Sequence, residues 1–457
     1  MTTRFIKIDP AAAMAEGLDA IRAEAGVAVG FSDEVEREAE IAAARVSQAE
    51  RCDVDFLTID PPGSRDLDQA IQIERAGEGH RVRYAIADVG FFVEPGSALD
   101  REAHARAVTV YAPDRKAPLH PEVLSEGAAS LLPGEWRPAV LWTLDLDGAG
   151  ELETVDVSRA QVRSVAQHTY DDVPEPLRSL LAEIGERRME IERRRGGIRL
   201  AVPEQEVERA DDGSWTVRYR APMPTEDWNA QVSLLTGMAA AGLMLKNGTG
   251  ILRTQAAPED RDLQRLRRQA EALGIEWRAE TPYPEMIRSL DPAMPAHAAL
   301  LHEATGVGSG ARYMAFDGSP PADGSHFSIA ADYAHATAPL RRLQDRFVSE
   351  CCLAAAAGAP IPGWVRAGLP ALPEAMAAGI RRAGAVERGV VDLVETLLLA
   401  GREGETFTAV VIDDGRLQLR DPAVRARMET SVEPGSGIEV RLVRADPAAR
   451  LVEFAAA

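Results

Sequence analysis

Three aspartates in one short segment are the residues of this chain that could most plainly do chemistry. Asp60 ends an apolar stretch, and the Pro-Pro-Gly sequence at 61–63 turns the chain at once. Asp66 and Asp68 are two positions apart, so in an extended chain both side chains leave the same face, and the turn can bring Asp60 back toward it. Converging carboxylates repel one another unless a cation joins them, and Mg²⁺ prefers oxygen ligands. The spacing therefore indicates a Mg²⁺ site, although an acidic turn that caps its own backbone has the same spacing.

A second polar segment surrounds Pro339. This proline predicts the start of a helix, with Thr337 as a possible cap. Arg341 and Arg342 would then lie in the first turn, where cations oppose the helix dipole, so local stability gives no reason for them. A phosphate would give one, because helix N–H groups and guanidinium groups both bind its oxygens. The segment predicts a phosphate site, and a pair between Arg341 and Asp345 on one helix face is the alternative.

The composition bounds the class of protein. The chain has 457 residues, enough for about two to four domains. Its longest apolar run, 234–245, is broken by Thr and Gly and is too short to cross a bilayer. The N-terminus lacks the basic, apolar and small-residue pattern of a secretion signal. Three cysteines without ligand spacing exclude a disulfide framework and a zinc site. These features predict a soluble cytoplasmic protein without a membrane partner.

The net charge of −21 argues against binding of nucleic acid over a general basic surface. Arginine is nevertheless dense in three places, 187–199, 261–268 and 341–346. Such runs are usually solvated helix faces, but they are also compatible with a basic channel inside an acidic shell. The sequence leaves both interpretations open.

The periodicity along the chain predicts an α+β protein with three parts. These are an N-terminal helical segment (1–50), a large domain of mixed β-sheet packed with helices (51–403) and a small all-β OB-like barrel (404–457). Predicted helices are 11–25, 32–49, 176–195, 228–245, 262–273, one opening at Pro339, and 373–400. Predicted strands are 56–59, 70–73, 82–89, 140–146, 215–219, 407–412, 416–419, 438–443 and 451–454.

Several segments, in order, resemble the RNB catalytic domain of the ribonuclease II and ribonuclease R family. The aspartate segment resembles the family's metal-binding signature, and 333–342 resembles its "HFTSPIRRY" segment. Between them, 84–89 is similar to the "HIADV" strand, with Ala85 where histidine is usual. The remaining matches are Tyr-Ala-Pro at 111–113, Pro-Leu-His-Pro at 118–121, Leu-Ser at 124–125 and Ala-Ser-Leu-Leu-Pro at 129–133. Any one of these would be weak, and their common order makes the resemblance specific.

The resemblance implies a 3′→5′ exoribonuclease that hydrolyses single-stranded RNA to nucleoside 5′-monophosphates. It implies Mg²⁺, with Mn²⁺ as a substitute, bound by Asp60, Asp66 and Asp68, and it makes Asp68 the indispensable catalytic aspartate. It assigns Arg341 to the scissile phosphate and Tyr111 to stacking on bases near the 3′ end. Arg342, beside Arg341, is a further expected RNA contact.

One position departs from the family pattern. Gln69 stands where a fourth aspartate is usual, and an amide oxygen can ligate Mg²⁺ but brings no charge. The alternative function is therefore an RNA-binding or scaffold protein whose metal site has decayed. An unrelated Mg²⁺ phosphohydrolase would explain the aspartates but not Tyr111 or the arginines. The short helical N-terminus and the barrel, whose strands carry only Phe407 and Phe454 as aromatics, predict weak RNA binding and low processivity.

Overall fold

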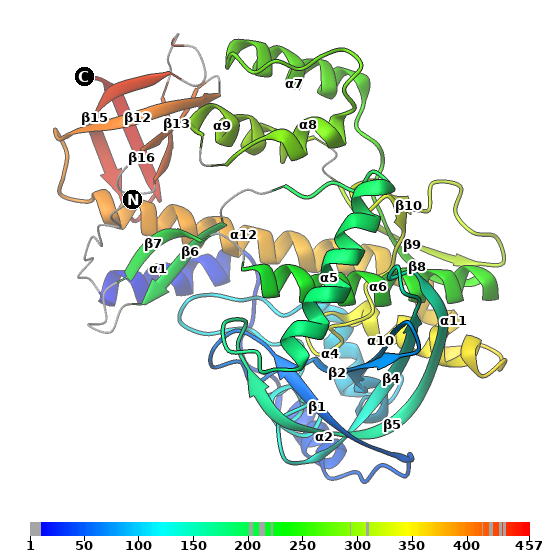
Figure 1. Cartoon of the computed structure of the whole chain (residues 1–457). Helices are drawn as coiled ribbons and strands as arrows, with labels where there is room; N and C mark the ends of the chain where they lie inside the picture. Colours follow the sequence, from blue (N-terminus) through cyan, green and yellow to red (C-terminus); the bar gives the residue numbers. More distant parts are fainter. Residues whose placement is uncertain are drawn as a thin grey trace.

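The fold contains two five-stranded barrels joined by a helical body (Figure 1). The structure, a computed structural model, describes residues 11–457 except 201–203, 210–214, 221–222, 293, 308–309, 414, 420–423, 429–431 and 433–435. Within these ranges, none of the helices combines the length and the apolar character needed to cross a bilayer. The predicted α+β class is confirmed: helices and strands are mixed throughout, and a small barrel stands at the C-terminal end.

The first barrel closes in chain order, from β1 to β5 and back to β1. Its neighbours are antiparallel except β1 and β5, because a closed ring of five strands cannot alternate direction throughout. The strands are β1 (Arg51–Ile59), β2 (Gln69–Ala76), β3 (Gly79–Ala87), β4 (Trp136–Leu146) and β5 (Leu152–His168).

Alternate side chains of this barrel enter two different hydrophobic clusters. Along β3, Val82, Tyr84 and Ile86 join the main core, whereas Ala85 and Ala87 join a second cluster. Since successive side chains of a strand point to opposite faces, the barrel wall is buried on both sides here. The second cluster also receives side chains from α2 and α4. The helices on this side are α2 (Asp33–Ala43), α3 (Val89–Phe92) and α4 (Ala98–Arg106), with a π-helical turn at Leu124–Ala128.

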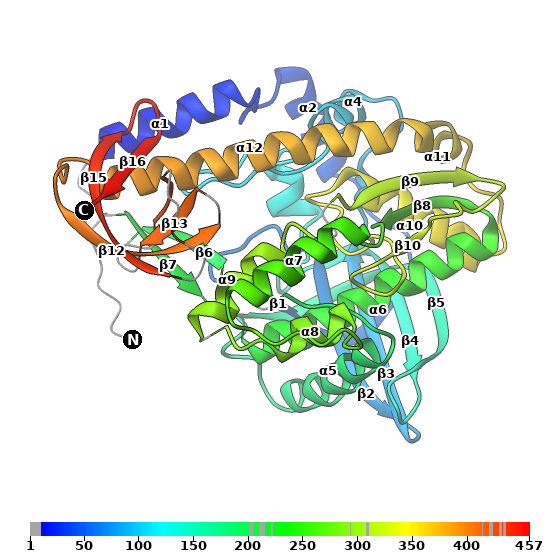
Figure 2. The same cartoon turned by 90° about the horizontal axis from the view of Figure 1, so that it is seen from above.

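Long helices form the body between the barrels (Figures 1 and 2). In both views α1 lies along α12, and the two helices approach closely: a Cβ on Gly17 would stand 2.5 Å from a methyl carbon of Leu393. Glycine is therefore required at this crossing for close packing. The helices of the body are α1 (Ala11–Glu24), α5 (Leu177–Arg194), α6 (Pro224–Asn247), α10 (Leu343–Ala356), α11 (Gly363–Gly368) and α12 (Leu372–Leu399), with a 3₁₀ turn at Leu369–Ala371.

A smaller helical group has a hydrophobic core of its own, built from side chains such as Leu266, Tyr283 and Leu300. It consists of α7 (Asp260–Ala272), α8 (Tyr283–Ser289) and α9 (Pro295–Ala304). Paired short strands accompany the helices: β6 (Glu204–Arg209) with β7 (Trp215–Arg220), β8 (Thr249–Thr254) with β9 (Arg312–Asp317), and β10 (Ser325–His326) with β11 (Ala331–Asp332).

The second barrel has the order β12-β13-β14-β16-β15, with β14 and β16 as its parallel pair. Phe407 and Phe454 meet edge to face inside it, with ring centroids 5.9 Å apart. Gly404, the predicted boundary, lies between α12 and this barrel. The strands are β12 (Thr406–Asp413), β13 (Arg416–Leu419), β14 (Arg425–Arg427), β15 (Gly437–Asp446) and β16 (Leu451–Ala456).

The prediction that a helix opens at Pro339 is wrong. Residues 339–341 form a turn, Arg342 is extended with φ −139° and ψ 121°, and α10 begins at Leu343. The reason is a tertiary contact that the local pattern does not contain. Arg342 pairs as a β-bridge with Val108, and the Leu343 N–H donates to the Ala107 carbonyl at 2.9 Å.

Candidate active site

The aspartate segment connects β1 to β2 at one end of the first barrel. Its backbone is held from two sides: the Asp60 N–H donates to the His168 carbonyl at 3.0 Å, and the Leu67 N–H donates to Ser130 Oγ at 2.9 Å. Ser130 Oγ in turn donates to the Arg65 carbonyl at 2.6 Å. The loop that carries the aspartates is thereby fixed by neighbours far away in the sequence.

Asp68 is the most deeply buried of the three aspartates, at 4% exposed. Its Oδ1 accepts the Leu340 N–H at 2.7 Å, and its Oδ2 lies 3.4 Å from Nε of Arg341. Burial raises the pKa of Asp68 to about 7, although Arg341 and the Leu340 N–H act in the opposite direction. The structure therefore brings two predicted site residues, Asp68 and Arg341, into direct contact.

Asp60 lies close enough to Asp66 and Arg341 for their charges to influence it. Burial, followed by repulsion from Asp66, raises the pKa of Asp60 to about 7, and Arg341 partly offsets this. Its Oδ2 atom is buried and has no hydrogen-bond partner among the described residues. A buried carboxylate oxygen without a donor is costly unless something binds it.

Asp66 has both carboxylate oxygens occupied by neighbouring side chains. The Tyr111 hydroxyl donates to Oδ2 at 3.1 Å, and Nζ of Lys116 lies 2.8 Å from Oδ1. Lys116 also reaches Oε1 of Glu126 at 2.7 Å. Burial alone would lower the pKa of Lys116, but its bonds to the two carboxylates raise it above the ordinary value. Lys116 and Glu126 were missed from the sequence, where nothing distinguishes them from surface charges.

Gln69 has its side-chain amide engaged on both sides. Nε2 donates to the Thr337 carbonyl at 2.6 Å, and Oε1 accepts the Tyr84 hydroxyl at 2.5 Å. The Tyr84 oxygen lies 2.9 Å from that of Ser233. Gln69 thus connects β2, β3, α6 and the segment before Pro339. An aspartate here could accept from Tyr84 but could not donate to Thr337.

Asp345 organises the turn that presents Arg341. It is fully buried and accepts the Ala338 N–H at 2.7 Å. It also accepts Nε and Nη2 of Arg342 at 2.9 and 2.8 Å, a bidentate pair. Burial would lower the pKa of Arg342, but Asp345 raises it. The sequence alternative that paired Asp345 with Arg341 is wrong, because the pair is with Arg342 and the helix begins after it.

The two arginines therefore differ in access. The Arg342 side chain is 17% exposed and bound to Asp345, whereas that of Arg341 is 43% exposed and lies 3.4 Å from Oδ2 of Asp68. Tyr111 is 52% exposed although its hydroxyl is anchored. Arg341 and the Tyr111 ring are the two predicted RNA contacts that a substrate can reach most easily.

The Tyr111–Lys116 loop is supported by α1. Arg22, itself 4% exposed, donates to both oxygens of Asp114 at 2.7 and 2.9 Å. Arg115 reaches Asp19 at 2.5 Å on the same helix. The N-terminal helix contributes none of the predicted site residues, but it positions the loop that carries Tyr111.

The donors of this site suit a hard divalent cation such as Mg²⁺. They are carboxylate oxygens, and one of them, Asp60 Oδ2, is buried without a partner. Asp60, Asp66 and Asp68 do not, however, already form a ready cage: among the described residues no three His, Cys, Asp or Glu side chains are grouped as metal ligands. Asp60 and Asp68 fit a cation better than Asp66, because Asp60 Oδ2 has no partner among the described residues and Arg341 lies 3.4 Å from Asp68, whereas Lys116 lies 2.8 Å from Asp66.

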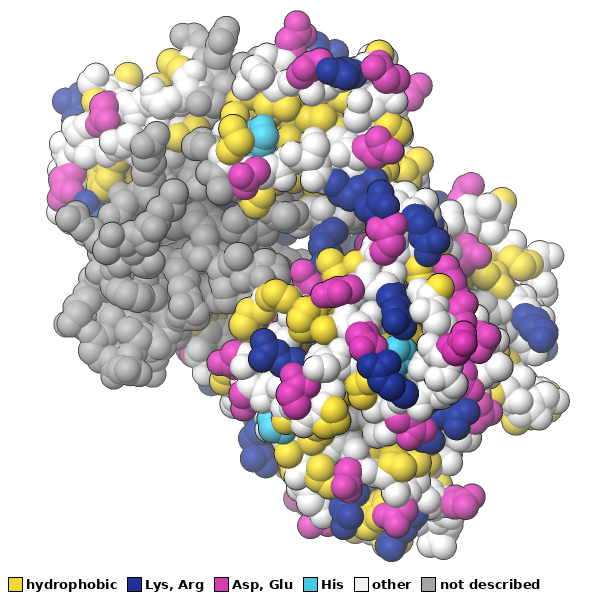
Figure 3. Space-filling model, in the orientation of Figure 1, with side chains coloured by type: hydrophobic (Ala, Val, Ile, Leu, Met, Phe, Trp, Pro, Cys, Tyr) yellow, Lys and Arg dark blue, Asp and Glu magenta, His cyan; other side chains and the backbone are white. Residues whose placement is uncertain are grey.

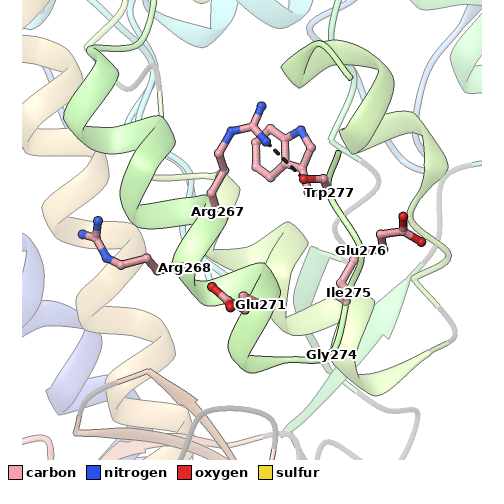
Figure 4. Close-up of a pocket in the computed structure, with 7 residues that line it drawn as sticks. All are labelled: Arg267, Arg268, Glu271, Gly274, Ile275, Glu276 and Trp277. Carbon is pink, nitrogen blue, oxygen red and sulfur yellow. Dashed lines mark hydrogen bonds between the residues drawn. The ribbon is translucent and has the colours of Figure 1, made fainter. Parts of the chain in front are cut away.

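Other surface features do not compete with this site. A pocket of about 420 Å³ lies on the α7–α9 group between Arg268, Glu271 and Trp277 (Figure 4), and it contains none of the candidate residues. The basic side chains over α5 in Figure 3 are interspersed with acidic ones. Arg188 and Arg194 reach Glu151, and Arg193 pairs with Glu190. These arginines of α5 are thus paired, as expected for a helix face and not for an open RNA channel.

Comparisons with known proteins identify two regions. Residues 51–356 match the family described as the RNB domain, and residues 405–457 match the RNase II-type exonuclease C-terminal S1 domain. Ribonuclease R of Aquifex aeolicus is 28% identical over 385 residues, which cover 78% of this chain and 53% of that protein. The chain spans about half the length of such curated relatives.

Two solved structures show how widely the fold is shared. Mycoplasma genitalium RNase R, solved in complex with ribose-methylated single-stranded RNA, superposes with a TM-score of 0.86 at 18% identity, over 98% of this chain and 78% of that one. Yeast Ssd1, described as a pseudonuclease, superposes with a TM-score of 0.71 at 16% identity, over 94% of this chain and 58% of that one. At these identities the likeness concerns the fold alone.

Proposed function

We propose that this chain, which belongs to the RNB family, hydrolyses single-stranded RNA from the 3′ end and releases nucleoside 5′-monophosphates. The observation that carries the proposal is the contact of Asp68 with Arg341 and the Leu340 N–H, which lie far away in the sequence. A carboxylate that binds a cation beside a guanidinium that binds a phosphate is the arrangement that the proposal requires, and the contact of Asp68 with Arg341 supports it. This juxtaposition suits phosphodiester chemistry: burial raises the pKa of Asp68, and Arg341 and the Leu340 N–H partly offset that increase.

The reaction requires a negatively charged phosphate to accept a nucleophile. A divalent cation held by Asp60 and Asp68 would supply activation of water and charge neutralisation at the departing oxygen. In the reaction, water adds to phosphorus while the bond to the 3′ oxygen breaks, so the released nucleotide keeps its 5′ phosphate. Arg341, which is 43% exposed beside Asp68, would bind a non-bridging oxygen of that phosphate.

Tyr111 is suited to hold the terminal nucleotide. Its ring is exposed, and its hydroxyl is fixed on Asp66 at 3.1 Å, so the stacking face is oriented before a substrate arrives. Stacking accepts any base and contributes roughly 1–3 kcal/mol per base. This fits an enzyme that removes nucleotides one after another without regard to sequence.

The decisive assay uses 5′-labelled single-stranded RNA with the purified chain and Mg²⁺, beside EDTA and Asp68→Asn controls. We expect shortening of the labelled strand from its 3′ end by the wild type, and a loss of at least about a thousandfold in Asp68→Asn. Asn keeps the shape and can still accept the Leu340 N–H, so the variant should remain folded. Equal cleavage by both proteins would refute the assignment.

A second function, RNA binding without hydrolysis, is favoured by one observation. The amide of Gln69 replaces the family's usual carboxylate and is bound to Thr337 and Tyr84. In that case the wild type would retain RNA in the same assay without shortening it, and Gln69→Asp would gain cleavage. No gain in Gln69→Asp, with an active wild type, would show that Gln69 serves as a structural connection.

A further inference from the structure

The loop that carries Tyr111 closes on Asp66 from both sides. Val110 and Ala117 form a two-way backbone bridge, with N–H to carbonyl distances of 2.9 and 2.7 Å. This bridge brings Tyr111 and Lys116, the first and last residues of the loop, to the same carboxylate. Each of them occupies one oxygen of Asp66, as described above. Tyr111 and Lys116 therefore compete with a metal ion for the oxygens of Asp66, and the positive charge of Lys116 opposes a second cation there.

Lys116 is held more firmly than a surface lysine. Its ammonium group bridges Asp66 and Glu126 at 2.8 and 2.7 Å, and the exposed fractions of the three side chains are 20%, 14% and 19%. Ion pairs in such partly buried surroundings are screened less by water and salt than exposed ones. Arg65 adds a further cation, 3.7 Å from Glu126. The charges of this group sum to zero without any bound ion.

The unbalanced negative charge lies on the other side of the site. Oδ2 of Asp68 lies 3.4 Å from Nε of Arg341, and Asp60 has a buried oxygen with no partner among the described residues. Gln69 is neutral and adds no ligand charge. The negative charge that a dication would neutralise thus lies at Asp60 and Asp68, whereas the charge of Asp66 is already neutralised by Lys116.

We propose that Lys116 is a resident cation of the active site, which neutralises Asp66 in place of a metal ion, so that the chain binds a single divalent cation through Asp60 and Asp68. The proposal rests on the proposed function only in that a divalent cation binds these aspartates. An ammonium group donates hydrogen bonds but cannot accept a ligand as a metal ion does. Lys116 therefore fixes the charge and the orientation of Asp66 and also limits how many cations the site can hold.

The test counts bound Mn²⁺ by electron paramagnetic resonance, on the full chain and without RNA. Lys116→Met keeps the length of the side chain and removes its charge, which leaves Arg65, Asp66 and Glu126 with a net negative charge. We expect one tight Mn²⁺ in the wild type and a second one in Lys116→Met, with a dissociation constant at least about tenfold tighter than any second wild-type site. Arg261→Met is the matched control, since Arg261 is an exposed cation on α7 that pairs with Glu259. It should bind Mn²⁺ as the wild type does.

A second pair of variants keeps the proposal testable if Lys116→Met fails to fold. Asp66→Asn should leave the single Mn²⁺ bound with less than about a threefold change in dissociation constant, whereas Asp60→Asn should weaken it by at least about tenfold. Two tight Mn²⁺ ions in the wild type, no second ion in folded Lys116→Met, or equal losses in Asp66→Asn and Asp60→Asn would each overturn the proposal. Because no RNA is present, an inactive protein that binds one Mn²⁺ would refute the nuclease function and leave this inference standing.

Discussion

The two barrels of the molecule have the same number of strands, and one parallel pair closes each of them. They differ most in the connection between their first two strands. In the first barrel this connection is the 60–68 segment, which carries all three aspartates. In the second barrel, β12 ends at Asp413 and β13 begins at Arg416. A closed five-stranded barrel thus serves as a scaffold. The chemistry that it can support depends on the residues of the loops at its ends.

A second difference is what covers that end. The first barrel receives the Pro339–Asp345 turn and the Tyr111–Lys116 loop, and both contact the aspartates directly. The second barrel has its aromatic pair inside and packs against α12. Substitutions around the first barrel should therefore change catalysis, and those in the second should change stability and RNA affinity. The following predictions test that division.

The largest effect is expected from Asp345→Asn. Removing this charge leaves the buried Arg342 unpaired, which costs about 3–5 kcal/mol of unfolding free energy. Because the same side chain shapes the turn with Arg341, the rate of RNA cleavage should fall by about a hundredfold or more. Denaturant unfolding and the labelled-RNA assay measure the two losses.

Asp332→Asn, an exposed aspartate of the same region, is the control and should change neither quantity. Addition of Arg342→Met to Asp345→Asn should recover part of the stability, because no unpaired charge remains buried. A double variant less stable than Asp345→Asn would contradict the assigned pairing.

In the second barrel, Phe454→Ala should cost about 3–5 kcal/mol of local stability through loss of the contact with Phe407. Hydrogen exchange should accelerate in β12–β16 and remain slow in β1–β5. Cleavage of a short oligonucleotide should be unchanged, since the aspartates lie on the other barrel. Val443→Ala, an exposed position in β15, serves as the control. A loss of short-oligonucleotide cleavage equal to that of Asp345→Asn would break the proposed division.

Tyr111→Ala should weaken binding of single-stranded RNA by about 1–3 kcal/mol, the contribution of one stacked base. Tyr111→Phe keeps the ring and loses only the hydrogen bond to Asp66, so its affinity should stay close to that of the wild type. Fluorescence anisotropy with Asp68→Asn as background separates binding from cleavage. Equal losses in the two variants would mean that the hydroxyl, and not the ring, contacts RNA.

The last prediction concerns pH. Burial lowers the pKa of His120 from 6.5 to about 3, so the unfolded chain takes up a proton below pH 6.5 that the folded protein refuses. His120 therefore makes stability fall as the pH drops through this window, by at most about 1.4 kcal/mol per pH unit. Asp60 and Asp68, whose pKa values are raised, act in the opposite direction but cancel in a comparison of variants. As the pH falls from 6.5 to 4.5, the unfolding free energy of His120→Asn should rise relative to that of the wild type. If the unfolding free energies of the two proteins changed in parallel with pH, His120 would not be the source of this effect.

Local patterns predicted the second barrel well. The strands predicted at 407–412, 416–419, 438–443 and 451–454 are confirmed as β12, β13, β15 and β16, because alternation and turn residues suffice for short strands. β5, by contrast, was missed, since its many polar residues interrupt the alternation. The strand predicted to run to Val89 ends at Ala87, because Asp88 caps the short helix α3 through the Phe91 N–H.

The site was predictable in its residues but not in its contacts. Asp68 contacts Arg341, and the charges of Asp66 and Arg341 act on Asp60, but among the described residues the three aspartates are not grouped as metal ligands. The partners of Gln69 and Asp68 are separated from them by 268 and 272 positions, and such pairs leave no local pattern. The same holds for Lys116, whose role depends on a carboxylate that another loop brings to it. The assignment of these residues to metal and RNA remains a prediction.

Because α1 supports the Tyr111 loop, it constrains both where the chain can be truncated and how its sequence can vary. A chain trimmed to the matched regions would keep Asp60, Asp66, Asp68, Arg341 and Arg342 but would lack Arg22, which donates two hydrogen bonds to Asp114. Glu24 of the same helix also meets Arg450 of the second barrel. We therefore expect positions 22 and 114 to covary among related sequences. Where one of the two residues is replaced, the other should carry a compensating replacement.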